Sequence, residues 1–94
     1  MPFPQQTPRS FTRQDIEALS PNQFGCYGLF RNDAWVYVGK GDIRERLLAH
    51  LNGQNPAISR ERPTHFVTVV TAGMDTLEKA LILELQPICN RKVG

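Results

Sequence analysis

Two short aromatic and β-branched segments, separated by only a few polar residues, constrain the fold of this chain most strongly. Residues 24–30 read FGCYGLF, residues 34–39 read AWVYVG, and an Asn-Asp pair lies between them. Aromatic and β-branched residues favour strands, whereas Asn and Asp favour tight turns. The pattern therefore predicts a β-hairpin.

Alternation along a strand decides which side chains share a face of the predicted hairpin. It places Tyr27 with Leu29 on one face of the first strand. In the second strand it places Trp35 with Tyr37 on one face. Taken singly, tyrosines in such strands are more often core residues than catalytic ones.

Three other segments have the capping residues or the apolar spacing of helices. The first is 11–21, in which Thr12 suits the N-cap position. The second is 42–51, with Asp42 as its N-cap and apolar residues at helical spacing. The third lies within 73–85 and ends before a proline.

The remaining segments complete an α/β (α+β) arrangement. Residues 64–70 are rich in β-branched side chains and predict a third strand, whereas the polar residues 52–63 predict a loop. The order helix, strand, strand, helix, strand, helix favours a small, mostly antiparallel three-stranded sheet flanked by helices. We expect residues 1–10 to form an extended N-terminal arm and residues 11–94 to form a single domain, given the short chain.

Charge, cysteine content and hydropathy exclude several classes of protein. The formal net charge is only +2, so any surface that binds nucleic acid must be local. Cys26 and Cys89 are too few and too far apart for a disulfide framework or a paired zinc site. No stretch has the pattern of a signal peptide or a membrane span. We therefore expect a cytoplasmic protein without a membrane partner.

Several residues near the end of the predicted hairpin could carry chemistry. Arg46 and His50 lie four residues apart on a predicted helix, so they share a face, which we expect to point outward. Tyr37 and Lys40 lie just before that helix. Glu78 lies in an apolar segment, where a carboxylate is costly unless it is paired or bound to a metal. Such groups suit phosphodiester hydrolysis, in which a metal, a guanidinium and a proton acceptor act together.

Two tripeptides and the residues that follow them form an ordered set. GCY at 25–27 and YVG at 37–39 are followed by Lys40 and by the segment DIRERL, which contains Arg46. His50 lies one helical turn later. This set resembles the paired tripeptides, the lysine and the arginine-bearing helix of the GIY-YIG nuclease superfamily, some members of which also have such a histidine.

Glu78 and Glu84 compete for the position of the superfamily's metal-binding glutamate. In the nucleotide excision repair endonuclease domain, that glutamate precedes a proline by nine residues. Glu78 has this spacing to Pro87, with Asn90 following, whereas Glu84 lies only three residues before the proline. The resemblance therefore favours Glu78, and it spans nearly the whole chain.

The resemblance implies a GIY-YIG-like, divalent-metal-dependent endonuclease that hydrolyses phosphodiester bonds in DNA. Glu78 would bind one Mg²⁺ or Mn²⁺, and Arg46 would hold the scissile phosphate. Tyr27 or Tyr37 would orient or deprotonate the attacking water, and the sequence does not decide between them. The implied substrate-binding residues are Arg46, Lys40 and Asn90, and the implied catalytic residues are Tyr27, Tyr37, Lys40, Arg46, His50 and Glu78.

The alternative function is a nucleic-acid-binding module that keeps this fold but cleaves nothing. A third hypothesis is a protein-interaction domain. Superfamily members usually obtain specificity from an attached DNA-binding domain, so we expect this short chain to depend on the structure of the DNA, on a homodimer or on a separate targeting partner. Four further cations are either scattered surface charges or contacts to a phosphate backbone: Arg60, Arg62, Arg91 and Lys92.

Overall fold

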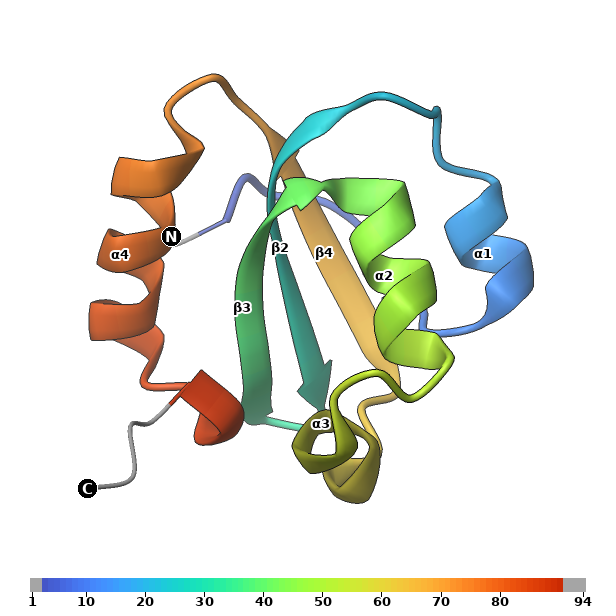
Figure 1. The fold of residues 1–94 in the computed structure, drawn as a ribbon. Coiled ribbons are helices and arrows are strands. Elements are labelled where there is room, and N and C mark those ends of the chain that lie inside the picture. Colours follow the sequence, from blue (N-terminus) through green and yellow to red (C-terminus); the bar gives the residue numbers. More distant parts are fainter. Residues whose placement is uncertain (1–2, 91–94) are drawn as a thin grey trace.

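The computed structural model describes residues 3–90 as an antiparallel sheet between helices (Figure 1). Its strands are β1 (Arg9–Ser10), β2 (Phe24–Arg31), β3 (Ala34–Asp42) and β4 (His65–Val70). The predicted hairpin is confirmed, because β2 pairs antiparallel with β3. The order of strands across the sheet is β1-β4-β2-β3, so β3 is an edge strand.

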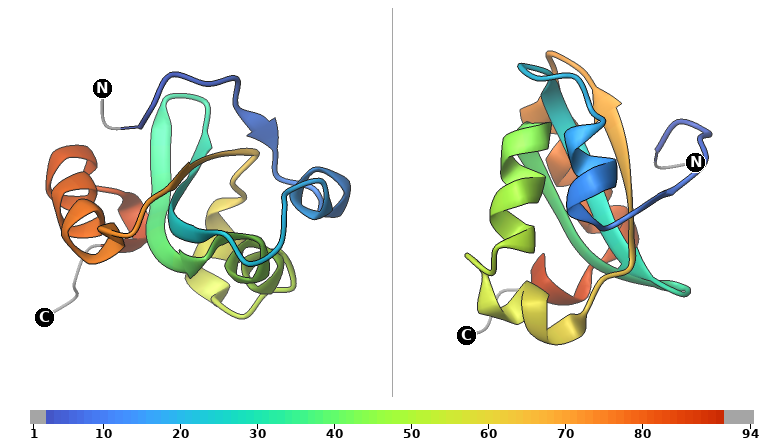
Figure 2. Two further views of the ribbon diagram at one scale, coloured as in Figure 1. Left: turned by 90° about the horizontal axis from the view of Figure 1, so that it is seen from above. Right: turned by 90° about the vertical axis from the view of Figure 1, so that its right-hand side faces the viewer.

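Helices cover both faces of the sheet, and each face has its own apolar core (Figure 2). The helices are α1 (Arg13–Glu17), α2 (Ile43–Leu51), α3 (Pro56–Glu61), α4 (Met74–Leu85) and the 3₁₀ helix η1 (Ile88–Asn90). Buried residues of α1, α2 and α3 pack with Leu29 and Phe66 on one face. Leu81 of α4 packs with Val38 and Val67 on the other. This arrangement confirms the predicted α/β (α+β) class.

Two predicted N-caps are confirmed by hydrogen bonds. The Asp15 amide donates to the Thr12 hydroxyl at the start of α1, and the Glu45 amide donates to the Asp42 carboxylate at the start of α2. Helix α4 ends before Pro87, as expected. Among residues 3–90, no helix is both long enough and apolar enough to span a membrane.

The sheet has four strands, so the predicted count of three is wrong. β1 pairs with β4 through Arg9–Phe66 and Ser10–His65. Further along the arm, the Gln6 side chain donates to the Thr68 carbonyl and accepts from the Thr68 amide, at 2.8 and 3.0 Å. A two-residue strand leaves no periodic pattern in the sequence, and these contacts join segments far apart in the chain.

The segment 52–63 contains the helix α3, where the sequence predicted only a loop. The Asn55 side chain accepts a hydrogen bond from the Ala57 amide, and Pro56 occupies the first turn. These residues suit a helix start, but six residues are too few to show helical periodicity. α3 buries Ile58 against the core beside α2.

The prediction that Trp35 and Tyr37 share a face of the sheet is wrong, because β3 contains a β-bulge between them. Leu29 pairs with Tyr37 and Phe30 pairs with Trp35, which leaves Val36 as an extra residue in β3. One extra residue reverses the alternation of side chains. Trp35 therefore packs with the α4 core, whereas Tyr37 packs with the α2 core.

Candidate active site

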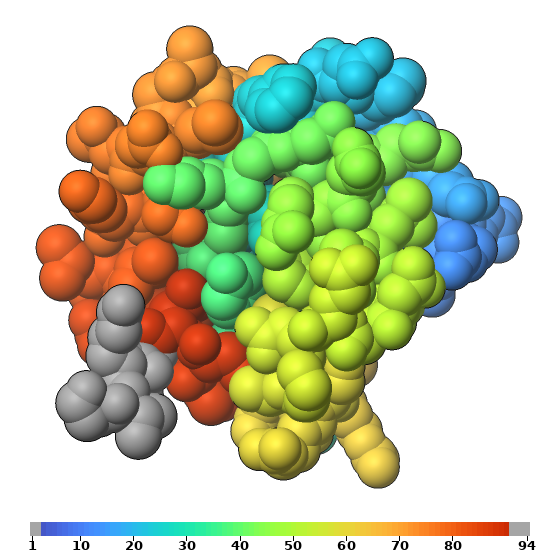
Figure 3. All heavy atoms as spheres, viewed as in Figure 1, coloured from blue at the N-terminus to red at the C-terminus, as the bar shows by residue number. Residues whose placement is uncertain are grey.

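The predicted site residues gather at the edge strand β3, where helices from both faces of the sheet meet. α2 contributes Arg46 and His50, and α4 contributes Glu78. In the space-filling view, β3 lies at the bottom of a depression between α2 and α4 (Figure 3). An edge strand is reached from both faces, so residues distant in sequence can surround one small region.

Tyr27 and His50 form a buried hydrogen-bonded pair. The Tyr27 hydroxyl lies 2.8 Å from His50 Nε2, and the two residues are 1% and 3% exposed. Tyr37 packs beside them, with its ring centroid 5.2 Å from that of His50. These contacts join β2, β3 and α2 at the centre of the site.

The expectation that His50 points outward with Arg46 is wrong. α2 buries Ile43, Leu47 and His50, which recur on one helical face, whereas Arg46 is exposed. The imidazole ring of His50 packs in the core, where its Nε2 is hydrogen-bonded to the Tyr27 hydroxyl while its Nδ1 has no partner among the described residues. The sequence spacing correctly predicted that Arg46 and His50 are neighbours on α2. It did not predict which of them faces the sheet.

Burial makes both members of this pair neutral at pH 7. Burial, with a smaller contribution from the Arg46 guanidinium, lowers the pKa of His50 from 6.5 to about 4. Burial also raises the pKa of Tyr27, as does the neighbouring Tyr37 when it is ionised, while Arg46 opposes the shift. The contact is therefore a hydrogen bond between a neutral phenol and a neutral imidazole.

We expect His50 to make the protein less stable in mild acid. Its pKa is lower in the folded protein than its ordinary value, so the unfolded chain binds more protons as the pH falls from 6.5 towards 4. The free energy of unfolding should then drop by about 2 kcal/mol between pH 7 and pH 4.5 because of this residue. Urea unfolding at both values would measure the drop, and His50→Gln should make it smaller. An equal drop in the free energy of unfolding in the wild type and in His50→Gln would show that His50 is not its cause.

Gly39 allows the Tyr27 hydroxyl to lie directly against the backbone of β3. A Cβ at Gly39 would come within 2.3 Å of Tyr27 Oη and 2.5 Å of Tyr27 Cζ. No side chain fits there unless the phenol moves. The glycine of the second tripeptide thus positions the tyrosine of the first.

We expect Gly39→Ala to displace Tyr27 and to destabilise the fold by about 1–3 kcal/mol, as overpacked cores do. Chemical denaturation would measure the change. Gly73→Ala is a matched control, because the nearest atom to its added Cβ would be Thr71 Oγ1 at 3.8 Å, an ordinary contact. Equal stability of the Gly39 and Gly73 variants would contradict the proposed role of Gly39.

Arg46 and Glu78 bring opposite charges to the half-buried Tyr37. Burial and the Glu78 carboxylate raise the pKa of Tyr37, and the Arg46 guanidinium opposes them. Arg46 lies on α2 and Glu78 on α4, so the two charges act on the phenol from helices on opposite faces of the sheet. The site thereby combines a carboxylate, a guanidinium and a phenol in one place.

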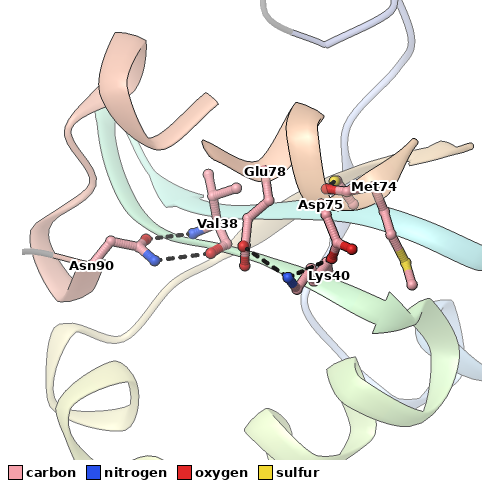
Figure 4. Close-up of polar contacts among 7 residues, drawn as sticks. Val38, Lys40, Met74, Asp75, Glu78 and Asn90 are labelled. Carbon is pink, nitrogen blue, oxygen red and sulfur yellow. Dashed lines mark hydrogen bonds and ion pairs between the residues drawn. The ribbon is translucent and has the colours of Figure 1, made fainter. Parts of the chain in front are cut away.

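Lys40 lies between two carboxylates of α4 (Figure 4). Its Nζ is 2.6 Å from Asp75 Oδ1 and 3.5 Å from Glu78 Oε1. The Asp75 hydrogen bond is the main reason that the pKa of Lys40 is raised, and Lys40 in turn lowers the pKa of Asp75. Lys40 and Glu78 are therefore in contact.

Asn90 binds the backbone of β3 beside the site (Figure 4). Its Nδ2 donates to the Val38 carbonyl at 2.9 Å, and its Oδ1 accepts from the Val38 amide at 2.7 Å. Both ends of the amide are thus used by the backbone. These contacts fix η1, and with it the end of α4, against the edge strand, so a positioning role suits Asn90 better than direct contact with a substrate.

Carboxylate oxygens in this region fit a hard divalent cation. The Glu78 side chain is 19% exposed, and Asp75 lies one helical turn away. Within residues 3–90 there is no group of three or more His, Cys, Asp or Glu side chains that could hold a metal. Mg²⁺ commonly binds one or two carboxylates and keeps several waters, so a site centred on Glu78 suits such an ion.

Two solved structures share this fold. Both are Tyr-to-Phe point mutants of the GIY-YIG N-terminal endonuclease domain of UvrC from Thermotoga maritima, bound to its catalytic divalent cation. They match with TM-scores of 0.71 and 0.66 and identities of 28% and 26%, each over 85% of this chain and 94% of the other. The chain has the GIY-YIG fold. No protein-family model and no curated protein matches the chain.

The GIY-YIG fold brings together the residues that the resemblance singled out. Tyr27, Tyr37 and His50 are in mutual contact, and Lys40 contacts Glu78. Sequence reasoning missed Asp75 as a site residue. Its spacing of three from Glu78 on a predicted helix was the available signal.

Two of the surface cations considered above lie on or beside α3. Arg60 is in the last turn of this helix, and Arg62 follows as its C-cap. Both side chains are exposed. Arg91 and Lys92 lie outside the described residues.

Proposed function

We propose that this GIY-YIG domain is a divalent-metal-dependent endonuclease that hydrolyses phosphodiester bonds in DNA. The observation that supports this most directly is that Tyr37 packs on His50, one helical turn from Arg46 on α2, while Lys40 of the same strand contacts Glu78. A carboxylate that can hold a cation, a guanidinium that can hold a phosphate and a phenol that can bind water are the groups this reaction uses. The endonuclease domains that share the fold are consistent with the same reaction.

We assign the metal to Glu78, with water molecules completing its coordination. Mg²⁺ or Mn²⁺ bound there would supply positive charge next to the scissile phosphate. Arg46 is exposed and would bind the non-bridging phosphate oxygens, for which its planar guanidinium is well suited. Lys40 would add a further positive charge beside Glu78, on the α4 side of β3.

The phenol of each tyrosine is better suited to orient a water molecule through a hydrogen bond than to remove a proton from it. The pKa of each phenol is raised, and such a phenol is a poor base near pH 7. Tyr37 is half-buried and therefore closer to solvent, whereas Tyr27 is fully buried and bonded to His50. We assign the contact with the attacking water to Tyr37 and the support of Tyr37 to the pair of Tyr27 and His50.

A cleavage assay tests this function. Labelled single-stranded, duplex and branched DNA would be incubated with the protein in Mg²⁺, Mn²⁺ or EDTA. We expect cleavage with a divalent metal, none with EDTA, and a preference for one DNA structure. Folded protein that binds DNA in a salt-dependent way but leaves every substrate intact would overturn the proposal in favour of a silent binding module.

A further inference from the structure

Asp75 shares the Lys40 ammonium with Glu78 and makes the shorter contact. The distances from Lys40 Nζ are 2.6 Å to Asp75 and 3.5 Å to Glu78. The two carboxylates lie three residues apart on α4, so they occupy neighbouring positions on one helical face. Figure 4 shows the lysine nitrogen between them.

The two carboxylates differ in how far they are exposed to solvent. The Asp75 side chain is 76% exposed, whereas that of Glu78 is 19% exposed. Asp75 therefore holds Lys40 at the outer rim of the depression, and Glu78 lies deeper, near Tyr37. Without the Asp75 charge, Glu78 would be the nearest carboxylate that Lys40 contacts.

An ammonium group and a divalent cation compete for the same carboxylate oxygens. A lysine that moved fully onto Glu78 would occupy those oxygens and would repel a cation that approached them. Lys40 can stay close to the site without this conflict only if another carboxylate binds its charge. Asp75 is placed to do so.

We propose that Asp75 is a positioning residue that draws the Lys40 ammonium away from Glu78 and so keeps Glu78 free to bind the divalent cation. This inference rests on the proposed function, because it takes Glu78 as the metal ligand. In this proposal Asp75 acts through Lys40, whose Nζ donates a 2.6 Å hydrogen bond to Asp75 Oδ1, and not on the metal.

Binding of Mn²⁺ alone, followed by the electron paramagnetic resonance signal of the free ion, tests the proposal without a cleavage assay. We expect Asp75→Asn to weaken Mn²⁺ binding about tenfold, the scale typical of residues that support metal ligands. Glu84→Gln removes the same charge from an exposed position on α4 and should bind Mn²⁺ as the wild type does.

The decisive comparison is made in the Lys40→Met background. There Asp75 has no ammonium to hold, so adding Asp75→Asn should leave the Mn²⁺ affinity unchanged. An equal loss with and without Lys40 would overturn the proposal, because Asp75 would then act on the metal directly or through its charge. Unchanged binding by Asp75→Asn alone would overturn it as well.

The Glu78→Gln variant separates this inference from the proposed function. If it weakens Mn²⁺ binding while Asp75→Asn does not, Glu78 is the ligand and only the role of Asp75 is wrong. If wild type and Glu78→Gln bind Mn²⁺ equally, the assigned metal site is wrong and the role of Asp75 is overturned with it.

Discussion

Glu78→Gln is expected to abolish metal-dependent DNA cleavage while leaving the fold and DNA binding intact. The amide has the shape of the carboxylate but lacks the negative charge that attracts a divalent cation. A bound metal contributes several kcal/mol to such reactions, so we expect the cleavage rate to fall by about 10³-fold or more. Single-turnover cleavage in Mg²⁺ and in Mn²⁺ would measure the loss.

The fold should tolerate this change because Lys40 keeps its shorter contact to Asp75. Glu84→Gln provides the matched control, since it makes the same substitution on the same helix at an exposed position. Its cleavage rate should equal that of the wild type. Cleavage by Glu78→Gln at the wild-type rate would rule out Glu78 as the metal ligand.

Arg46→Ala is expected to reduce kcat/KM for cleavage by about 10²–10³-fold, the cost of removing one preorganised charge that faces the transition state. Arg46 is exposed on α2, and its positive charge opposes the rise in the pKa of both Tyr27 and Tyr37, so its charge acts on the proposed site. Arg46→Lys should restore only part of the rate, because an ammonium cannot bind two phosphate oxygens in the planar manner of a guanidinium. Cleavage kinetics at fixed salt would measure both variants.

A distant arginine separates a specific role of Arg46 from a general loss of positive charge. Arg31 is exposed at the turn of the β2–β3 hairpin, at the opposite end of β3 from Lys40. We expect Arg31→Ala to cleave almost as fast as the wild type. If kcat/KM for cleavage fell equally in both alanine variants, Arg46 would contribute only to the general electrostatic attraction of DNA.

Local sequence signals predicted the features that neighbouring residues determine. The hairpin followed from two β-rich segments around an Asn-Asp pair, and the caps at Thr12 and Asp42 followed from their position before apolar segments. The spacing of Glu78 to Pro87 and Asn90 favoured Glu78 over Glu84, and in the structure Glu78 lies beside Lys40. In each of these cases the deciding residues are close in sequence.

The features that the sequence did not predict depend on contacts between distant segments. The bulge at Val36 changes which face Tyr37 occupies, and only the pairing of β3 with β2 reveals it. The burial of His50 depends on the phenol of Tyr27, which lies on another element. The hydrogen bond that Asp75 accepts comes from Lys40, a residue of β3.

The amide side chain of Asn90 has a consequence for how copies of this domain behave at high concentration. Strands at the edge of a sheet expose unpaired amide and carbonyl groups, which can pair with a strand of another molecule and start aggregation. Asn90 occupies both groups of Val38 on β3, and Gln6 does the same for Thr68 on β4. Two side chains thus cap part of each edge of the sheet, at Val38 and at Thr68, against pairing with a strand of another molecule.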